Sequence, residues 1–86
     1  MKLTRDIIKN TTVDKVIELV LKKLQKKMTK KGMGGFVSSH EGYGVVMDEF
    51  VELGEAVHDN DIDGVINEIV DIAVAAIWSI ASFIKE

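Results

Sequence analysis

The apolar residues of this chain recur at spacings of three and four residues in three separate segments. In the first segment they run from Val13 to Leu24, a spacing that places them on one face of a helix. The stretch Thr11-Thr12-Val13-Asp14 has the form of a capping box, which marks a helix start. Gly32 follows a run of lysines and is suited to end the helix. We therefore predict a helix over residues 12–31.

Two further helices follow from the same kind of pattern. Ser38-Ser39-His40-Glu41 is a second capping box, and the apolar spacing after it predicts a helix that runs to about His58. The polar turn "HDNDID" comes next, where Asn60 or Asp61 can cap the third helix. That helix is expected over about residues 62–85. Because the connecting turn is short, the second and third helices should form an antiparallel hairpin.

The remaining sequence contains nothing that predicts a strand. No segment alternates convincingly between apolar and polar residues, and the chain has no proline to interrupt a helix. Residues 3–9 allow one more short helical turn. At 86 residues the chain is long enough for a single small domain. The prediction is an all-α domain over residues 1–86, built from an antiparallel helical hairpin and an N-terminal helix.

The third helix is apolar nearly all round from Ile69 to Ile84. A helix of this kind has to be buried on several sides. Three helices from one chain cover it poorly, so we expect a homo-oligomer, a dimer or tetramer, to complete the helical bundle. The longest uncharged stretch, Ile72 to Ile84, has 13 residues, fewer than the ~20 of a membrane span. We therefore predict a cytoplasmic protein with no membrane partner.

Charge is distributed unevenly along the chain. Residues 15–31 carry seven lysines and one glutamate, whereas acidic residues dominate from residue 40 onward. No aromatic residues are interleaved with the lysines to stack on bases, so nucleic acid is not the expected partner. There is no cysteine, which excludes disulfides and thiolate metal sites.

Two acidic pairs with the same spacing are the candidate functional residues. Glu49 and Glu52 are three residues apart, as are Glu68 and Asp71, so each pair projects from one side of its helix. The pairs lie at similar distances before and after the turn, and the hairpin should bring all four carboxylates together. Two like charges 4 Å apart repel by ~4 kcal/mol at an effective dielectric of ~20. A cation should compensate, and an all-oxygen site suits Mg²⁺ or Mn²⁺.

This paired motif resembles the signature of the MazG-like all-α nucleoside triphosphate pyrophosphohydrolases. Fifteen residues separate its two halves, and the preceding "SSHEGYGVVMDEFVELGEA" is also similar to small MazG-like proteins. The resemblance covers roughly residues 32–80. It implies Mg²⁺-dependent cleavage of a nucleoside triphosphate between its α and β phosphates, which yields the monophosphate and pyrophosphate. It also implies metal ligation by Glu49, Glu52, Glu68 and Asp71, with Glu52 a candidate to orient the attacking water.

The chain differs from that family at two points. Asp48 stands where the family often has glutamate. Family members usually hold phosphate with a longer fourth helix, and here we expect a neighbouring subunit to supply that wall. Two alternatives stay open. The acidic residues can form salt bridges to lysines of the first helix, and the protein can be a non-enzymatic assembly or partner-binding module with a vestigial metal site. Trp78 and Phe83 can stack on a nucleobase or pack in a core or subunit interface.

Overall fold

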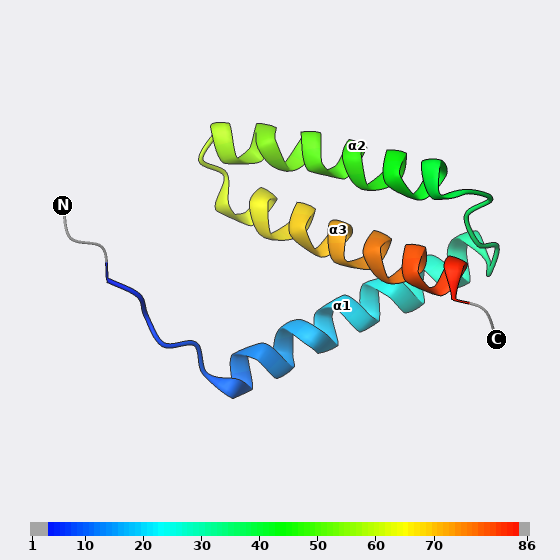
Figure 1. Ribbon diagram of the computed structural model, residues 1–86. Helices are drawn as coiled ribbons and strands as arrows, with labels where there is room; N and C mark the ends of the chain where they lie inside the picture. Colours follow the sequence, from blue (N-terminus) through cyan, green and yellow to red (C-terminus); the bar gives the residue numbers. More distant parts are fainter. Residues whose placement is uncertain (1–3, 85–86) are drawn as a thin grey trace.

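The structure is a computed structural model that describes residues 4–84. These residues form three α-helices and no strand: α1 (Asn10–Lys31), α2 (Ser39–His58) and α3 (Ile62–Phe83) (Figure 1). The prediction of an all-α fold is confirmed.

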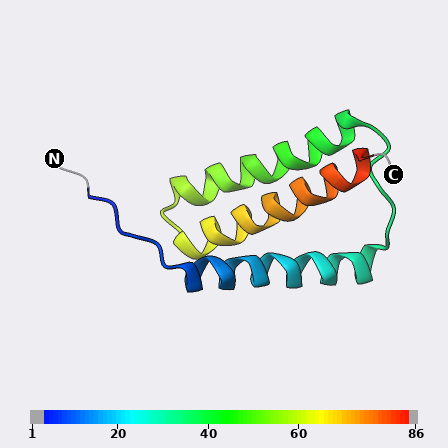
Figure 2. The same ribbon diagram turned by 60° about the horizontal axis from the view of Figure 1, so that its bottom comes forward.

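The second and third helices form the hairpin that the sequence predicts. They lie antiparallel and side by side along most of their length (Figures 1 and 2). The first helix packs less extensively against α3 and runs in the same direction as α3 (Figure 2). In the described part of the chain, α1 does not approach α2 closely. The third helix is therefore the central element, and the molecule is somewhat extended, at 48 × 29 × 23 Å.

The predicted signals that begin α2 and α3 are confirmed. Ser38 is the N-cap of α2, and its hydroxyl accepts a hydrogen bond of 3.2 Å from the backbone N–H of Glu41. The Glu41 carboxylate in turn accepts one from the backbone N–H of Val37. Asp61 caps α3 by accepting from the backbone N–H of Gly64 at 3.0 Å. These caps fix where the two arms of the hairpin begin.

The start of α1 differs from the prediction. The helix begins at Asn10, its N-cap is Lys9, and no side chain caps it. The predicted capping box at 11–14 is therefore wrong, because the earlier start places its threonines inside the first turn. Residues 4–9 are not helical, so the suggested turn is absent there, and residue 3 lies outside the described residues. At the other end Gly32 terminates α1 as predicted, with φ of 84°.

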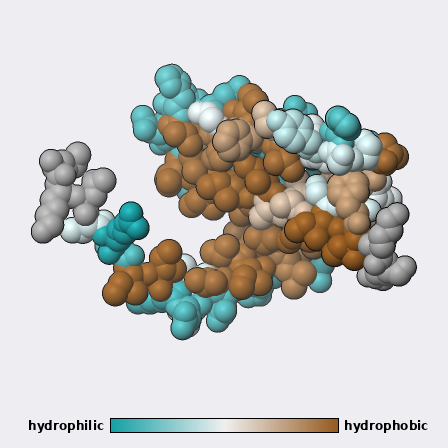
Figure 3. Space-filling view, viewed as in Figure 1, coloured by the Kyte–Doolittle hydropathy of each residue, from teal (hydrophilic) through white to brown (hydrophobic). Residues whose placement is uncertain are grey.

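The chain by itself buries few apolar side chains. Among the described residues the buried apolar ones are Val70, Val74 and Ala75, all from α3. Many large apolar residues are exposed on all three helices, and Figure 3 shows apolar surface over much of the hairpin and of α1. Contiguous apolar surface of this kind marks an interaction site. The expected oligomer stays a prediction that this surface motivates.

By length and composition α3 is also able to cross a membrane. A mostly buried core helix of a water-soluble protein passes the same test, but only 17% of this stretch of α3 is buried within the described residues. Two acidic residues, Glu68 and Asp71, lie near the middle of α3. A carboxylate at the centre of a bilayer costs ~3 kcal/mol or more. The composition of α3 is thus better suited to packing against protein, and cytoplasmic location stays a prediction.

Candidate metal centre

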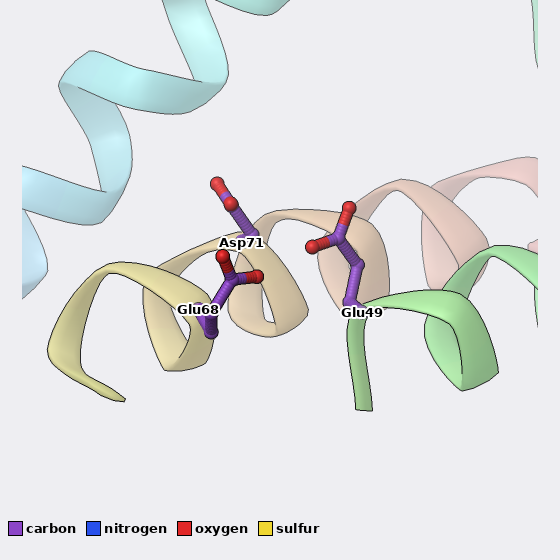
Figure 4. A group of neighbouring side chains, drawn as sticks. All are labelled: Glu49, Glu68 and Asp71. Atoms are coloured by element: carbon purple, nitrogen blue, oxygen red, sulfur yellow. The ribbon is translucent and has the colours of Figure 1, made fainter. Parts of the chain in front are cut away.

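The hairpin brings together carboxylates from both of its arms. Glu49 projects from α2, and Glu68 and Asp71 project from successive turns of α3. Each offers one carboxylate oxygen, and these three oxygens lie within 4.8 Å of one another. Figure 4 shows the three side chains turned toward a common space. All three residues are half-buried, so water screens their charges less than it does on an open surface. This arrangement can hold a metal ion.

Within the described part of the chain, two oxygens of these carboxylates have no hydrogen-bond partner. Glu49 Oε2 and Glu68 Oε2 are both inaccessible to solvent and unpaired. A buried polar atom without a partner costs free energy, about 1–3 kcal/mol for a neutral group and more for a charged one. Native structures rarely tolerate this cost without a reason. Hard divalent cations bind oxygen ligands, so the donor set fits Mg²⁺ or Mn²⁺.

The fourth predicted residue, Glu52, lies beside this group rather than within it. Residue Glu52 is exposed, whereas Glu49 one turn earlier on α2 is half-buried. A hydrogen bond to the Glu68 carboxyl, and repulsion by its charge, raise the pKa of Glu52 above its ordinary 4.5. Burial, and after it a hydrogen bond with the Glu49 carboxyl, raise the pKa of Glu68 above its ordinary 4.5. The structure therefore places Glu52 next to Glu68, at the rim of the cluster.

A lysine from α1 compensates part of the acidic charge. Lys23 Nζ lies 2.5 Å from Asp71 Oδ1 and donates a hydrogen bond of 2.9 Å to Asn67 Oδ1. This ion pair is the salt bridge that the sequence left open as an alternative. It accounts for Asp71 but leaves the unpaired oxygens of Glu49 and Glu68 without a cation. A structural role at Asp71 and a metal site at the cluster are therefore compatible.

Sequence reasoning did not identify Lys23 and Asn67 individually. Asn67 precedes Asp71 by four residues, so helical spacing was a signal that both face the same side. Nothing in the sequence distinguishes Lys23 from the other lysines of α1, because the choice depends on how α1 docks against α3.

Comparison with known proteins adds no family. No protein-family model matches the chain, and neither a curated protein nor a solved structure is significantly similar to it. The geometry shows a three-helix protein with an acidic group able to hold a metal ion.

Proposed function

We propose that this protein is a metal-dependent nucleoside triphosphate pyrophosphohydrolase of the MazG-like kind that its acidic motif resembles. The substrate is a nucleoside triphosphate, and the products are its monophosphate and pyrophosphate. The observation that carries the proposal is the group Glu49, Glu68 and Asp71, each of which offers an oxygen within 4.8 Å of the others. Within the described residues, Glu49 and Glu68 each also have a buried oxygen without a hydrogen-bond partner.

The roles proposed for the side chains follow from their positions. Glu49, Glu68 and Asp71 are the inner metal ligands, and Glu52 completes the set from the rim. A Mg²⁺ or Mn²⁺ ion bound there supplies charge to hold phosphate oxygens and lowers the pKa of a coordinated water. Glu52 is exposed, and the neighbouring Glu68 raises its pKa. Its place at the exposed rim of the cluster, beside Glu68, leaves Glu52 within reach of solvent, which suits it to orient the attacking water.

A second candidate is a non-enzymatic assembly or partner-binding module with a vestigial site. The exposed apolar surface of the hairpin favours it, as does the lysine that already neutralises Asp71. Under this reading the protein oligomerises or binds a partner but releases no pyrophosphate. The enzyme proposal includes a homo-oligomer as well, so oligomerisation alone does not separate the two.

The decisive experiment is a product assay over a panel of ribonucleoside and deoxyribonucleoside triphosphates. Each nucleotide is incubated with the protein in Mg²⁺, in Mn²⁺ and in EDTA, and pyrophosphate, orthophosphate and the nucleotide products are quantified separately. We expect equimolar monophosphate and pyrophosphate for at least one nucleotide, and neither in EDTA. Diphosphate with orthophosphate would indicate another phosphohydrolase. No metal-dependent product from any nucleotide would favour the assembly module.

A further inference from the structure

A pocket of about 200 Å³ lies between α1, the loop that follows it, and the hairpin. Its lining is mainly apolar, and all three helices contribute to it. The lining includes Lys27 and Lys31 of α1, Phe36 of the loop, Val45 of α2 and Trp78 of α3.

Two hydrogen bonds tie the loop of this pocket to α3. The indole Nε1–H of Trp78 donates to the backbone oxygen of Gly34 at 3.0 Å. The backbone N–H of Phe36 donates to the hydroxyl of Ser82, also at 3.0 Å. The first bond holds the indole of Trp78, the second holds the backbone at Phe36, and both residues line the pocket. Two aromatic residues in the lining favour a flat ligand, because ring pairs gain free energy beyond their buried area.

The size of the pocket limits what it can hold. Sites for drug-sized ligands typically measure ~300–1,000 Å³. A pocket of about 200 Å³ therefore suits a single planar ring system rather than a whole nucleotide. Among residues 4–84, the charged residues in the lining are Lys27 and Lys31, and none of the lining residues is acidic. The ring system should accordingly belong to an anionic molecule.

The pocket and the acidic group lie on the same faces of α1 and α3, with the pocket further along both helices. On α3, Asp71 precedes Ala75 by four residues and Trp78 by seven, so these residues share one face. On α1, Lys23 contacts Asp71, and Lys27 follows one turn later. Because α1 and α3 run in the same direction (Figure 2), both helices lead from the carboxylates into the pocket. Seven helical residues correspond to ~10 Å along the axis.

We propose that this pocket binds the nucleobase of the substrate, with the phosphate chain extending past Lys27 to the carboxylate group. The base stacks against Trp78 and Phe36, and Lys27 contributes positive charge beside the phosphates. This inference rests on the proposed function and adds a base subsite formed within one chain.

Trp78 is the single tryptophan of the chain, so its indole N–H gives one assignable signal in a ¹H–¹⁵N NMR spectrum. The full chain is titrated in EDTA, which prevents turnover, with adenosine, guanosine, cytidine, uridine and thymidine and with their 5′-monophosphates. We expect a saturable shift of the indole signal with at least one base. Pyrophosphate alone should not produce this shift.

Two matched pairs of variants locate the binding site. Val45→Phe adds bulk inside the pocket, whereas Val51→Phe adds it on an exposed part of α2 outside the pocket. We expect Val45→Phe to weaken binding by at least about tenfold and Val51→Phe to leave it unchanged. Lys27→Ala should weaken monophosphate binding roughly two- to fivefold, the range for an exposed ion pair. Lys26→Ala removes an equal charge outside the pocket and should have no effect. Both lysines are exposed, so this second pair decides the matter if Val45→Phe fails to fold.

The outcomes separate this inference from the proposed function. The subsite is supported if binding moves the indole signal and is weakened by Val45→Phe and Lys27→Ala but not by their controls. This holds even if no pyrophosphate is ever released. Pyrophosphate release with unchanged KM in Val45→Phe and Lys27→Ala would overturn the subsite and leave the enzyme proposal standing. Binding that leaves the indole signal unmoved, or no binding by any of the nucleosides and monophosphates, would also overturn the subsite.

Discussion

Lys23 of α1 forms an ion pair with Asp71 of α3, at a distance of 2.5 Å between Nζ and Oδ1. Lys23 also donates a hydrogen bond to Asn67 one turn earlier on α3. These contacts attach α1 to the central helix beside the carboxylate group. A metal ion that takes Asp71 as a ligand competes with Lys23 for the same oxygens. The ion pair therefore links the docking of α1 to the charge state of the site.

The first prediction removes this lysine. In Lys23→Met the metal-free protein should lose up to ~1 kcal/mol of unfolding free energy, the usual limit for a solvent-accessible ion pair. For a domain of this size that corresponds to several degrees in Tm. The affinity for Mg²⁺ or Mn²⁺ should rise, because the ion no longer displaces a cation. Thermal melts in EDTA and calorimetric metal titration measure both effects. Lys26→Met is the control, and equal metal affinity in both variants would rule out competition.

The second prediction concerns activity. Glu68→Gln and Glu52→Gln keep the side-chain shape but lose the charge that binds metal, so each should remove most of the pyrophosphohydrolase activity. Mutating residues that only support metal ligands already costs ~10–100-fold, so loss of a ligand should lower kcat/KM by at least about a hundredfold. Glu55→Gln, an exposed change on the same helix α2, is the matched control. Full activity in both variants would exclude these residues from the mechanism.

The third prediction uses stability to separate repulsion from pairing. Glu49 has an unpaired buried oxygen, and no cation pairs with it in the described part of the chain. Glu49→Gln should therefore raise the Tm in EDTA, because it relieves repulsion within the group. Asp71→Asn should raise the Tm in EDTA less than Glu49→Gln does, or lower it, because it also removes the ion pair with Lys23. Both changes should reduce the stabilisation by metal, which for wild type is ~2.7 kcal/mol at a hundredfold excess over Kd.

Melts of the wild type and both variants, with EDTA and with excess metal, provide the measurement. If wild type melts at the same temperature in both conditions, and Glu49→Gln melts lower in both, the group holds no metal. In that case Glu49 would have a structural role that its surroundings do not suggest.

The hairpin and its acidic group were predictable because the signals for them are local. Ser38 and Asp61 define the starts of α2 and α3 through contacts three residues away. The carboxylates converge because the two pairs lie at similar distances from one short turn. The exposure of Glu52, compared with the half-buried Glu49, depends instead on how α2 is rotated about its axis against α3. Spacing along one helix does not determine that rotation.

The placement of α1 was not predictable for a related reason. A glycine-containing loop connects Gly32 to Ser38, so the sequence fixes neither the direction nor the register of α1 against α3. The contact between Lys23 and Asp71 depends on that register, as does the pocket around Trp78. A local pattern predicts the helix, whereas its docking results from contacts between residues that are 44 or more positions apart.

The fourth prediction is a pH dependence of the metal-free protein. The pKa values of Glu52 and Glu68 are raised above 4.5 in the folded state, where Glu49, Asp71 and Lys23 are the neighbouring charges. The folded state therefore binds more protons than the unfolded state from pH 4.5 up to the raised values. The contribution of these groups to stability is present below that window and is lost as the pH rises through it.

Denaturant melts in EDTA across this pH window should show the unfolding free energy falling as the pH rises. In Glu68→Gln this free energy should depend less on pH, because one of the titrating groups is removed. Metal affinity should change in the opposite direction and rise with pH, since protons must leave before the ion binds. A metal affinity that does not change with pH between 4.5 and neutrality would contradict this assignment.

The last prediction concerns assembly through the hairpin. Tyr43 and Ile80 are 69% and 60% exposed and, with Phe83, line a shallow apolar groove where α2 meets α3. Water contact over such a surface is unfavourable, at about 25 cal/mol per Å² of apolar area. We expect a dimer or tetramer at micromolar concentration, measured by light scattering coupled to gel filtration. Ile80→Glu should shift the population to smaller species, because a charge would have to be buried in the interface. Val37→Glu, in the loop outside this groove, should keep the wild-type mass. A monodisperse wild-type monomer would contradict the assembly, and an unchanged oligomer in Ile80→Glu would place the interface on another face.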